Sequence, residues 1–168
     1  RALADHPDVA EVTVLSDILP EPMAELDLGP AIRVKRVWHF NGIGTPFRVL
    51  RALAAEKPDA VIYNTHRASF GDRELTAALG LLTPAASRLA GFTSGLIAHN
   101  IIAGIDLETT LLKGQPLRQA VVRLGGAAVT RAMSWASYMT VTLRGYADTL
   151  AKSVPNADVT LVPHGTFD

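Results

Sequence analysis

The chain has 168 residues, a suitable length for one domain, and its 16 Lys and Arg balance 16 Asp and Glu, so the formal net charge is zero. This balance argues against a nucleic-acid binder driven by overall charge, and 6% aromatic residues are too few for a platform that stacks single-stranded bases. The lack of cysteine excludes disulfide bonds and zinc–thiolate sites and suits a reducing, cytoplasmic setting.

Two strands are expected in the first part of the chain. Residues 1–6 (RALADH) have the pattern of the last turn of a helix, and we therefore expect the sequence to start inside a domain. Residues 11–16 (EVTVLS) predict a strand, which a loop rich in Pro and acidic residues follows. Residues 31–40 (AIRVKRVWHF) alternate only in part, which predicts a more exposed, peripheral strand.

A helix and a buried strand are expected next. The helix follows a Gly-Ile-Gly turn, where Thr45 can act as N-cap and Pro46 suits the first helical position. The run 59–64 (DAVIYN) is almost continuously apolar, as in strands whose two faces are both covered by helices. A second helix is predicted from a cap at Asp72 to about Leu89.

The second half of the chain repeats the alternation of strands and helices. Strand patterns at 94–100, 138–143 and 158–165 are separated by two helical ones, of which the first opens at Pro116 and the second covers 144–153. Apolar residues at helical spacing predict the buried face of the first helix: Leu117, Ala120, Val121, Leu124 and Ala128. The whole pattern predicts an α/β fold: one Rossmann-like domain over residues 1–168, with an open, mainly parallel sheet and helices on both faces.

Polar side chains follow directly on most of the expected strands. Ligands of open parallel sheets bind beyond the carboxyl ends of the strands, and these ends share one edge. The residues at that edge are His39 after the second strand, Asn64, Thr65, His66 and Arg67 after the third, His99 and Asn100 after the fourth, Thr142 and Arg144 after the fifth, and Pro163, His164 and Gly165 after the sixth. We expect several of them to converge in one site.

Each of these positions also has a structural explanation. A single histidine at a strand end is more often a hydrogen-bonded structural residue than a catalyst, and His39 belongs to the weakest strand. Arg67 favours a functional role for His66, because a guanidinium beside an imidazole suits phosphate or carboxylate. The pair also fits a solvated loop. Arg144 opens a helix, where the dipole slightly disfavours a cation; this fits either an anionic partner or an exposed side chain.

Several common catalytic motifs are absent from the sequence. No pair of histidines has the short spacing of a dedicated metal site, so no metal is expected. There is no G-x-S-x-G elbow, no P-loop and no full dinucleotide fingerprint, and the Gly-Ile-Gly at 42–44 is best explained as a turn. Asp106 and Glu108, near the end of the fourth strand, suit sugar hydroxyls as well as solvent.

Four stretches, VIYNTHRASFGD, GLIAHNIIAG, TVTLRGYADTL and the closing VTLVPHGTFD, resemble the N-terminal domain of two-domain, group-one (family 4-like) glycosyltransferases of the GT-B fold. The resemblance covers most of residues 45–168. It implies that this acceptor-side domain lacks a first strand and a glycine-containing loop before Arg1, and that a separate donor-binding domain is absent from the chain. Pro163, His164 and Gly165 then match the hinge between the two domains.

The resemblance also implies roles for single residues. In the family, the histidine that ends this strand before Asn or Asp usually points into the cleft near the transferred sugar, so His99 is the expected catalytic residue, with Asn100 orienting it. Their position at the strand ends, rather than the resemblance, makes His66, Arg67, Thr142 and Arg144 the residues expected to bind substrate. Enzymes of this fold generally need no metal bound by a D-x-D motif, and no D-x-D occurs here.

The implied function is transfer of a sugar from a nucleotide-sugar donor to a sugar or lipid-linked acceptor, with no cofactor, metal or nucleic acid, and with this domain inactive alone. Two alternatives stay open: a GT-B nucleotide-sugar epimerase and a non-enzymatic, flavodoxin-like binding domain. Members of the family commonly work at the inner membrane face, so a cytoplasmic protein is expected. The sequence contains no apolar run of about 18 residues and no strong basic amphipathic helix to support membrane binding.

Overall fold

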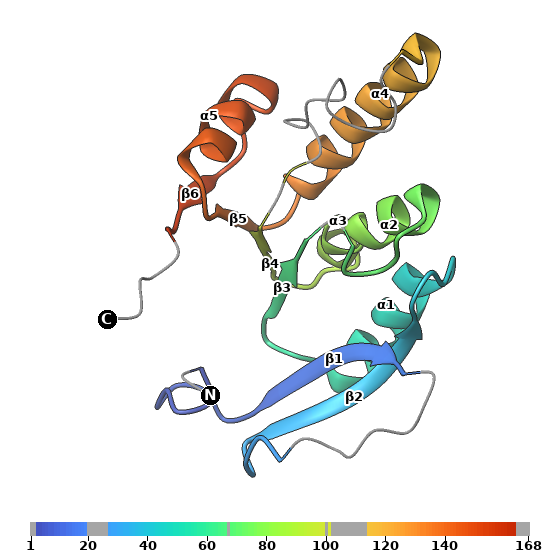
Figure 1. Ribbon diagram of the computed structural model, residues 1–168. Coiled ribbons are helices and arrows are strands. Elements are labelled where there is room, and N and C mark those ends of the chain that lie inside the picture. The colour runs from blue at the N-terminus through green and yellow to red at the C-terminus, as the bar shows by residue number, and fades with distance from the viewer. Residues whose placement is uncertain (1–2, 20–26, 67, 100, 102–113, 164–168) are drawn as a thin grey trace.

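Strands and helices alternate in the computed structural model, which describes residues 3–19, 27–66, 68–99, 101 and 114–163 (Figure 1). The strands are β1 (Val12–Ile18), β2 (Ile32–His39), β3 (Val61–Thr65), β4 (Ser94–Ala98), β5 (Tyr138–Val141) and β6 (Val159–Leu161). The helices are α1 (Thr45–Glu56), α2 (Glu74–Leu81), α3 (Thr83–Leu89), α4 (Pro116–Met133) and α5 (Arg144–Ser153). Leu3 to Asp8 form turns rather than the expected helical end, and the His6 N–H donates to the Leu3 carbonyl at 3.3 Å.

The strands form two parallel sheets. β1 pairs with β2, and β3, β4, β5 and β6 follow one another in a four-stranded sheet. Every crossover between neighbouring strands of the larger sheet contains at least one helix, which is the usual way to join parallel neighbours. The α/β, Rossmann-like open sheet expected from the sequence is therefore confirmed.

The two faces of the four-stranded sheet are unequal. Tyr63, Leu96 and Met139 are at most 7% exposed and face the helices, which all lie on one side in Figure 1. Ile62 and Tyr138 point to the other face and are 46% and 38% exposed. Within the described residues, the helices therefore cover one face rather than both, and the apolar run 59–64 does not lie in a strand buried on two sides.

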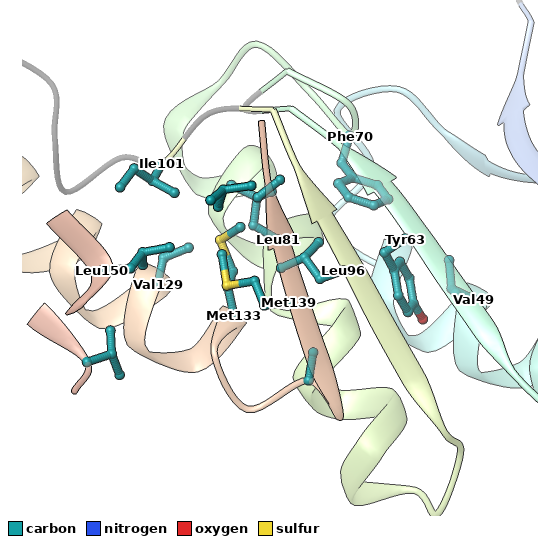
Figure 2. Packing of buried hydrophobic residues seen from close by; sticks show 14 of the residues in the cluster. Val49, Tyr63, Phe70, Leu81, Leu96, Ile101, Val129, Met133, Met139 and Leu150 are labelled. Carbon is teal, nitrogen blue, oxygen red and sulfur yellow. The ribbon is translucent and has the colours of Figure 1, made fainter. Parts of the chain in front are cut away.

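A single hydrophobic core joins the covered face to the helices (Figure 2). Leu96 and Met139 from the sheet meet Met133 of α4 and Leu150 of α5, and all four are at most 1% exposed. The smaller sheet belongs to the same core, because Leu15 of β1 packs partly buried against it. Burial of such side chains contributes roughly 1.5–3 kcal/mol each, which makes this layer the main source of stability.

The helix expected up to Leu89 is divided in two. α2 ends at Leu81, and α3 begins at Thr83 with Pro84 in its first turn. Proline has no N–H to donate to the Gly80 carbonyl, and its ring displaces the preceding turn, so a continuous helix is not formed here. The sequence interpretation overlooked this break.

Neither expected helix cap is confirmed. Thr45 lies inside α1, where its buried hydroxyl donates to the Gly42 carbonyl at 2.7 Å, and no side chain caps this helix. No side chain caps α2 either: Asn41 Oδ1 accepts from the N–H of Asp72 at 3.0 Å and from that of Arg73 at 3.2 Å, and both residues precede the helix. A contact from a residue 31 positions away has no local sequence signal.

The face of α4 that the sequence predicted to be buried is exposed. Leu117, Val121 and Leu124 are 79%, 63% and 73% exposed, whereas Val129 and Met133 are buried. The helix itself was predicted correctly, but periodicity identifies an apolar stripe without saying which side meets the sheet.

Candidate functional site

The carboxyl ends of the four-stranded sheet lie at one edge, as expected. The pairing register places Thr65 opposite Ala98, Ala98 opposite Val141, and Val141 opposite Leu161. The residues that follow these positions therefore form a row across the sheet. This row includes His66, His99, Thr142 and Val162.

A shallow hollow of about 400 Å³ opens on the uncovered face next to this edge. It is lined by Ile62, Asn64, Ile97, His99, Tyr138, Thr140, Thr142, Val162 and Pro163. The lining alternates along each strand because every second side chain points to the same face. The hollow thus has an apolar floor and a polar rim at the carboxyl edge.

His99 and Asn64 form the polar centre of the hollow. Their side chains, on β3 and just beyond β4, are joined by a 2.5 Å hydrogen bond between His99 Nε2 and Asn64 Oδ1. An amide oxygen can only accept, so His99 carries a proton on Nε2. The His99 backbone N–H also donates to the Thr65 carbonyl at 3.1 Å, which extends the β3–β4 ladder by one residue and holds the imidazole over the open face.

Tyr138 forms one wall of the hollow and lies over Gly95 of the neighbouring strand. A Cβ atom on Gly95 would overlap the Tyr138 ring, so glycine is needed for the aromatic ring to lie against the sheet. Sequence reasoning missed Ile62, Tyr138 and Thr140 as site residues. The available signal was strand alternation, since these residues share a face with His99.

The structure brings only some of the expected site residues together. Thr142, which is 9% exposed, and Pro163 line the hollow with His99. His66 lies at the same edge but outside the lining, where its Nδ1 accepts from the Ala68 N–H at 3.1 Å. Arg144 is the exposed first residue of α5 and is also outside the lining.

Several other expected residues lie outside the described residues. They are Arg67, Asn100, Asp106, Glu108, His164 and Gly165. His39 is the exposed last residue of β2 and does not line the hollow.

The chemistry available in the hollow is that of hydrogen bonding and proton transfer. Its polar side chains are an imidazole, a carboxamide, a phenol and two threonine hydroxyls, which suit a ligand with several hydroxyl groups. Among the described residues, no group of three His, Asp or Glu side chains is placed to hold a metal ion.

No protein-family model matches the chain, and no curated protein matches it. In the part of the chain that the structure describes, no helix combines the length and apolar character required to cross a membrane.

Proposed function

We propose that the chain is the acceptor-side domain of a GT-B glycosyltransferase, which moves a sugar from a nucleotide-sugar donor to a hydroxyl acceptor. The sequence stretches that resemble this family support the proposal, as does the Rossmann-like fold. The observation that carries it is the His99–Asn64 pair in the hollow at the carboxyl edge of the sheet. An open parallel sheet binds its ligands at this edge.

In this reaction the bond between the anomeric carbon and the diphosphate oxygen breaks, and the electron pair leaves with the diphosphate. The acceptor oxygen bonds to the anomeric carbon and loses its proton. His99 contacts the donor sugar near the reacting carbon, where charge develops, and Asn64 fixes the orientation of the imidazole ring by accepting its Nε2 proton. His99 is the proposed catalytic residue and Asn64 a positioning residue.

The remaining roles follow from the position of these residues at the strand ends. Thr142 contacts the acceptor within the hollow, while His66, Arg67 and Arg144 hold an anionic acceptor at the edge, and Asn100 assists His99. Donor binding falls mainly to a second domain, which the hinge at 163–165 joins. The proposed setting is the cytoplasm.

The test is the replacement of His99 by alanine in the full-length enzyme. Turnover, measured as nucleoside diphosphate release from a panel of UDP-, GDP- and ADP-hexoses with candidate acceptors, is expected to fall at least ~100-fold, because a group acting in the transition state is lost. His6→Ala is the matched control, since His6 is exposed and outside the hollow. Near-normal turnover of His99→Ala would remove the assignment.

The same assay separates the alternative functions. An epimerase would convert the nucleotide-sugar to an epimer of unchanged mass without any acceptor. A non-enzymatic domain would bind a ligand without turnover. Either result would contradict the proposal, whereas acceptor-dependent release of nucleoside diphosphate together with a glycosylated acceptor would support it.

A further inference from the structure

Asn41 and Gly42 form a chemically labile pair in the turn between β2 and α1. The chain contains four asparagines, and only Asn41 is followed by glycine. The backbone nitrogen that follows an asparagine can attack the carbon of the side-chain amide. Glycine favours this attack because it has no side chain to obstruct the approach and restricts the backbone least. The sequence therefore places the most reactive kind of asparagine in this turn.

The fold requires both residues of the pair. Asn41 has a positive φ of 63°, a conformation that asparagine adopts more readily than most residues. A Cβ atom on Gly42 would lie 2.7 Å from the His39 carbonyl oxygen, closer than real Cβ atoms approach a backbone atom, so glycine is needed as well. Neither residue can be replaced without strain in the turn, although the pair is reactive.

The Asn41 carboxamide is held by four hydrogen bonds to residues around the start of α2. Its Nδ2 donates to Asp72 Oδ1 at 2.8 Å. Its Oδ1 accepts from the Asp72 N–H at 3.0 Å, the Arg73 N–H at 3.2 Å and the Thr76 hydroxyl at 3.0 Å. Gly71 lies directly against it, since a Cβ there would be 2.5 Å from Asn41 Oδ1. We refer to residues 71, 72, 73 and 76 as the cage, which fixes the direction of the amide.

The attacking nitrogen is held as well. The Gly42 N–H donates to the His39 carbonyl at 2.8 Å, and the Asn41 N–H donates to the Phe70 carbonyl at 2.9 Å. Phe70 in turn packs against buried Trp38, with ring centroids 5.4 Å apart. Ring closure removes the Gly42 proton and turns the Asn41 amide out of the cage, so hydrogen bonds of both groups must be lost. The native turn therefore opposes the reaction on both sides.

We propose that Asn41–Gly42 is a deamidation site that the cage keeps unreacted in the native protein and that reacts when the start of α2 opens. In the reaction the Gly42 nitrogen bonds to Asn41 Cγ, the bond from Cγ to Nδ2 breaks, and ammonia leaves with the proton of the Gly42 N–H. Water then opens the cyclic imide and leaves either an aspartate or an isoaspartate, in which the backbone runs through the former side chain. This inference does not depend on the proposed sugar transfer.

The product no longer fits the cage. The amide nitrogen that donates to Asp72 is replaced by a carboxylate oxygen, so two carboxylates meet where a hydrogen bond had been. An isoaspartate also adds a methylene between the Cα of residue 41 and Gly42, which displaces the Gly42 N–H from the His39 carbonyl. A molecule that reacts while this segment is open therefore does not return to the native turn.

The direct test follows deamidation of the full-length protein by peptide mass spectrometry, in native buffer and in urea that unfolds it. In urea, Asn41 is expected to react fastest of the four asparagines. In native buffer its rate should be at least ~10-fold lower, because the reaction then waits for local opening. Asn156 is the internal control, since it is exposed and followed by alanine, and its slow rate should be similar in both conditions.

Variants of the cage test whether it is the protecting element. Asp72→Ala removes the acceptor of the Asn41 amide, and Thr76→Val removes a donor to it while keeping the shape of the side chain. Each should raise the native rate at least ~3-fold, as expected for the loss of one hydrogen bond, and leave the rate in urea unchanged. Thr149→Val is the matched control, because the Thr149 hydroxyl donates within α5 to the Gly145 carbonyl at 2.8 Å, outside the cage. It should leave the native rate unchanged.

A second readout examines the aspartate product itself. Asn41→Asp should unfold at a lower urea concentration than the unmodified protein, since its carboxylate faces that of Asp72. The exchange Asn41→Asp/Asp72→Asn should recover most of this loss, because the amide at position 72 can donate to the carboxylate at position 41.

Native deamidation of Asn41 as fast as in urea would overturn the proposal, because it would show that the fold does not restrain the pair. So would unchanged native rates in both cage variants, or an Asn41→Asp variant as stable as the unmodified protein. None of the altered residues lines the hollow, so these outcomes are separate from those of the sugar-transfer assay.

Discussion

Asn41 and Asp72 are 31 positions apart and are joined twice by the same side chain: Asn41 Nδ2 donates to Asp72 Oδ1 at 2.8 Å, and Asn41 Oδ1 accepts from the Asp72 N–H at 3.0 Å. Asn41 thereby connects the turn after β2 to the start of α2. It also has a positive φ of 63°, in the left-handed region that Asn tolerates better than most residues. One side chain therefore fixes both the shape of the turn and the position of the helix.

Replacement of Asn41 by alanine should lower the free energy of unfolding by about 2–4 kcal/mol. The variant loses the hydrogen bonds that Asn41 makes to Asp72 and Arg73 and places an alanine in the left-handed region. Asn41→Gly separates these contributions, because glycine keeps the backbone conformation at no steric cost; it should lose about 1–2 kcal/mol. Urea unfolding measures both, and equal losses would show that the left-handed conformation adds no strain.

Tyr63 should make stability fall at alkaline pH. Its hydroxyl is buried and lies 2.5 Å from Ser87 Oγ, and burial raises the Tyr63 pKa from 10.0 to about 12. The folded state therefore holds the phenol proton more tightly than the unfolded state. This contribution is complete below pH 10 and is lost as the pH rises to about 12, by up to about 3 kcal/mol.

The control for this effect is Tyr63→Phe, which removes the ionisable group. Other groups also titrate at high pH, so the relevant quantity is the difference between the two proteins. The variant should be less stable near neutral pH, because the Ser87 hydroxyl loses its partner, but should lack the additional alkaline loss. Parallel stability curves from pH 9 to pH 12 would contradict the prediction.

Gly95→Ala should displace Tyr138 from the wall of the hollow. The added Cβ overlaps the ring, and the cost is expected to be about 1–3 kcal/mol, as for other overpacked sites. Tyr138→Ala removes the ring, so Gly95→Ala should cost less in that background. A double-mutant cycle of unfolding free energies measures this coupling, and additive effects would show that the two residues do not compete for the same space.

Backbone amides of β3 should exchange with solvent in an alternating pattern. The Val61 N–H donates to the Thr93 carbonyl just before β4, so the N–H groups of Val61 and Tyr63 point toward β4. The N–H groups of Ile62 and Asn64 point toward the opposite edge of β3. Within the described residues, no strand pairs with this edge. Hydrogen exchange followed by NMR should therefore be at least ~10-fold faster at Ile62 and Asn64 than at Tyr63. Equal protection would reveal a further segment paired with β3.

The candidate site was predictable in part, because a parallel sheet forces its strand ends to one edge. This rule brings His99, Thr142 and Pro163 to the same edge, where all three line the hollow. It could not separate them from His66, which follows β3 at the same edge but turns into a local loop with Ala68. Which of the neighbouring side chains face the hollow depends on the path of the chain after each strand.

The amino-acid sequence by itself determined the class of fold and the order of its elements, because alternation of short apolar runs with helical periodicity is a local property of the chain. Tertiary structure alone decided which faces are buried. The stripe of α4 at Leu117, Val121 and Leu124 is exposed, and one face of the four-stranded sheet is open, because burial depends on which elements meet in space. The same holds for the Asn41–Asp72 hydrogen bonds and the His99–Asn64 pair, whose partners lie more than thirty positions apart.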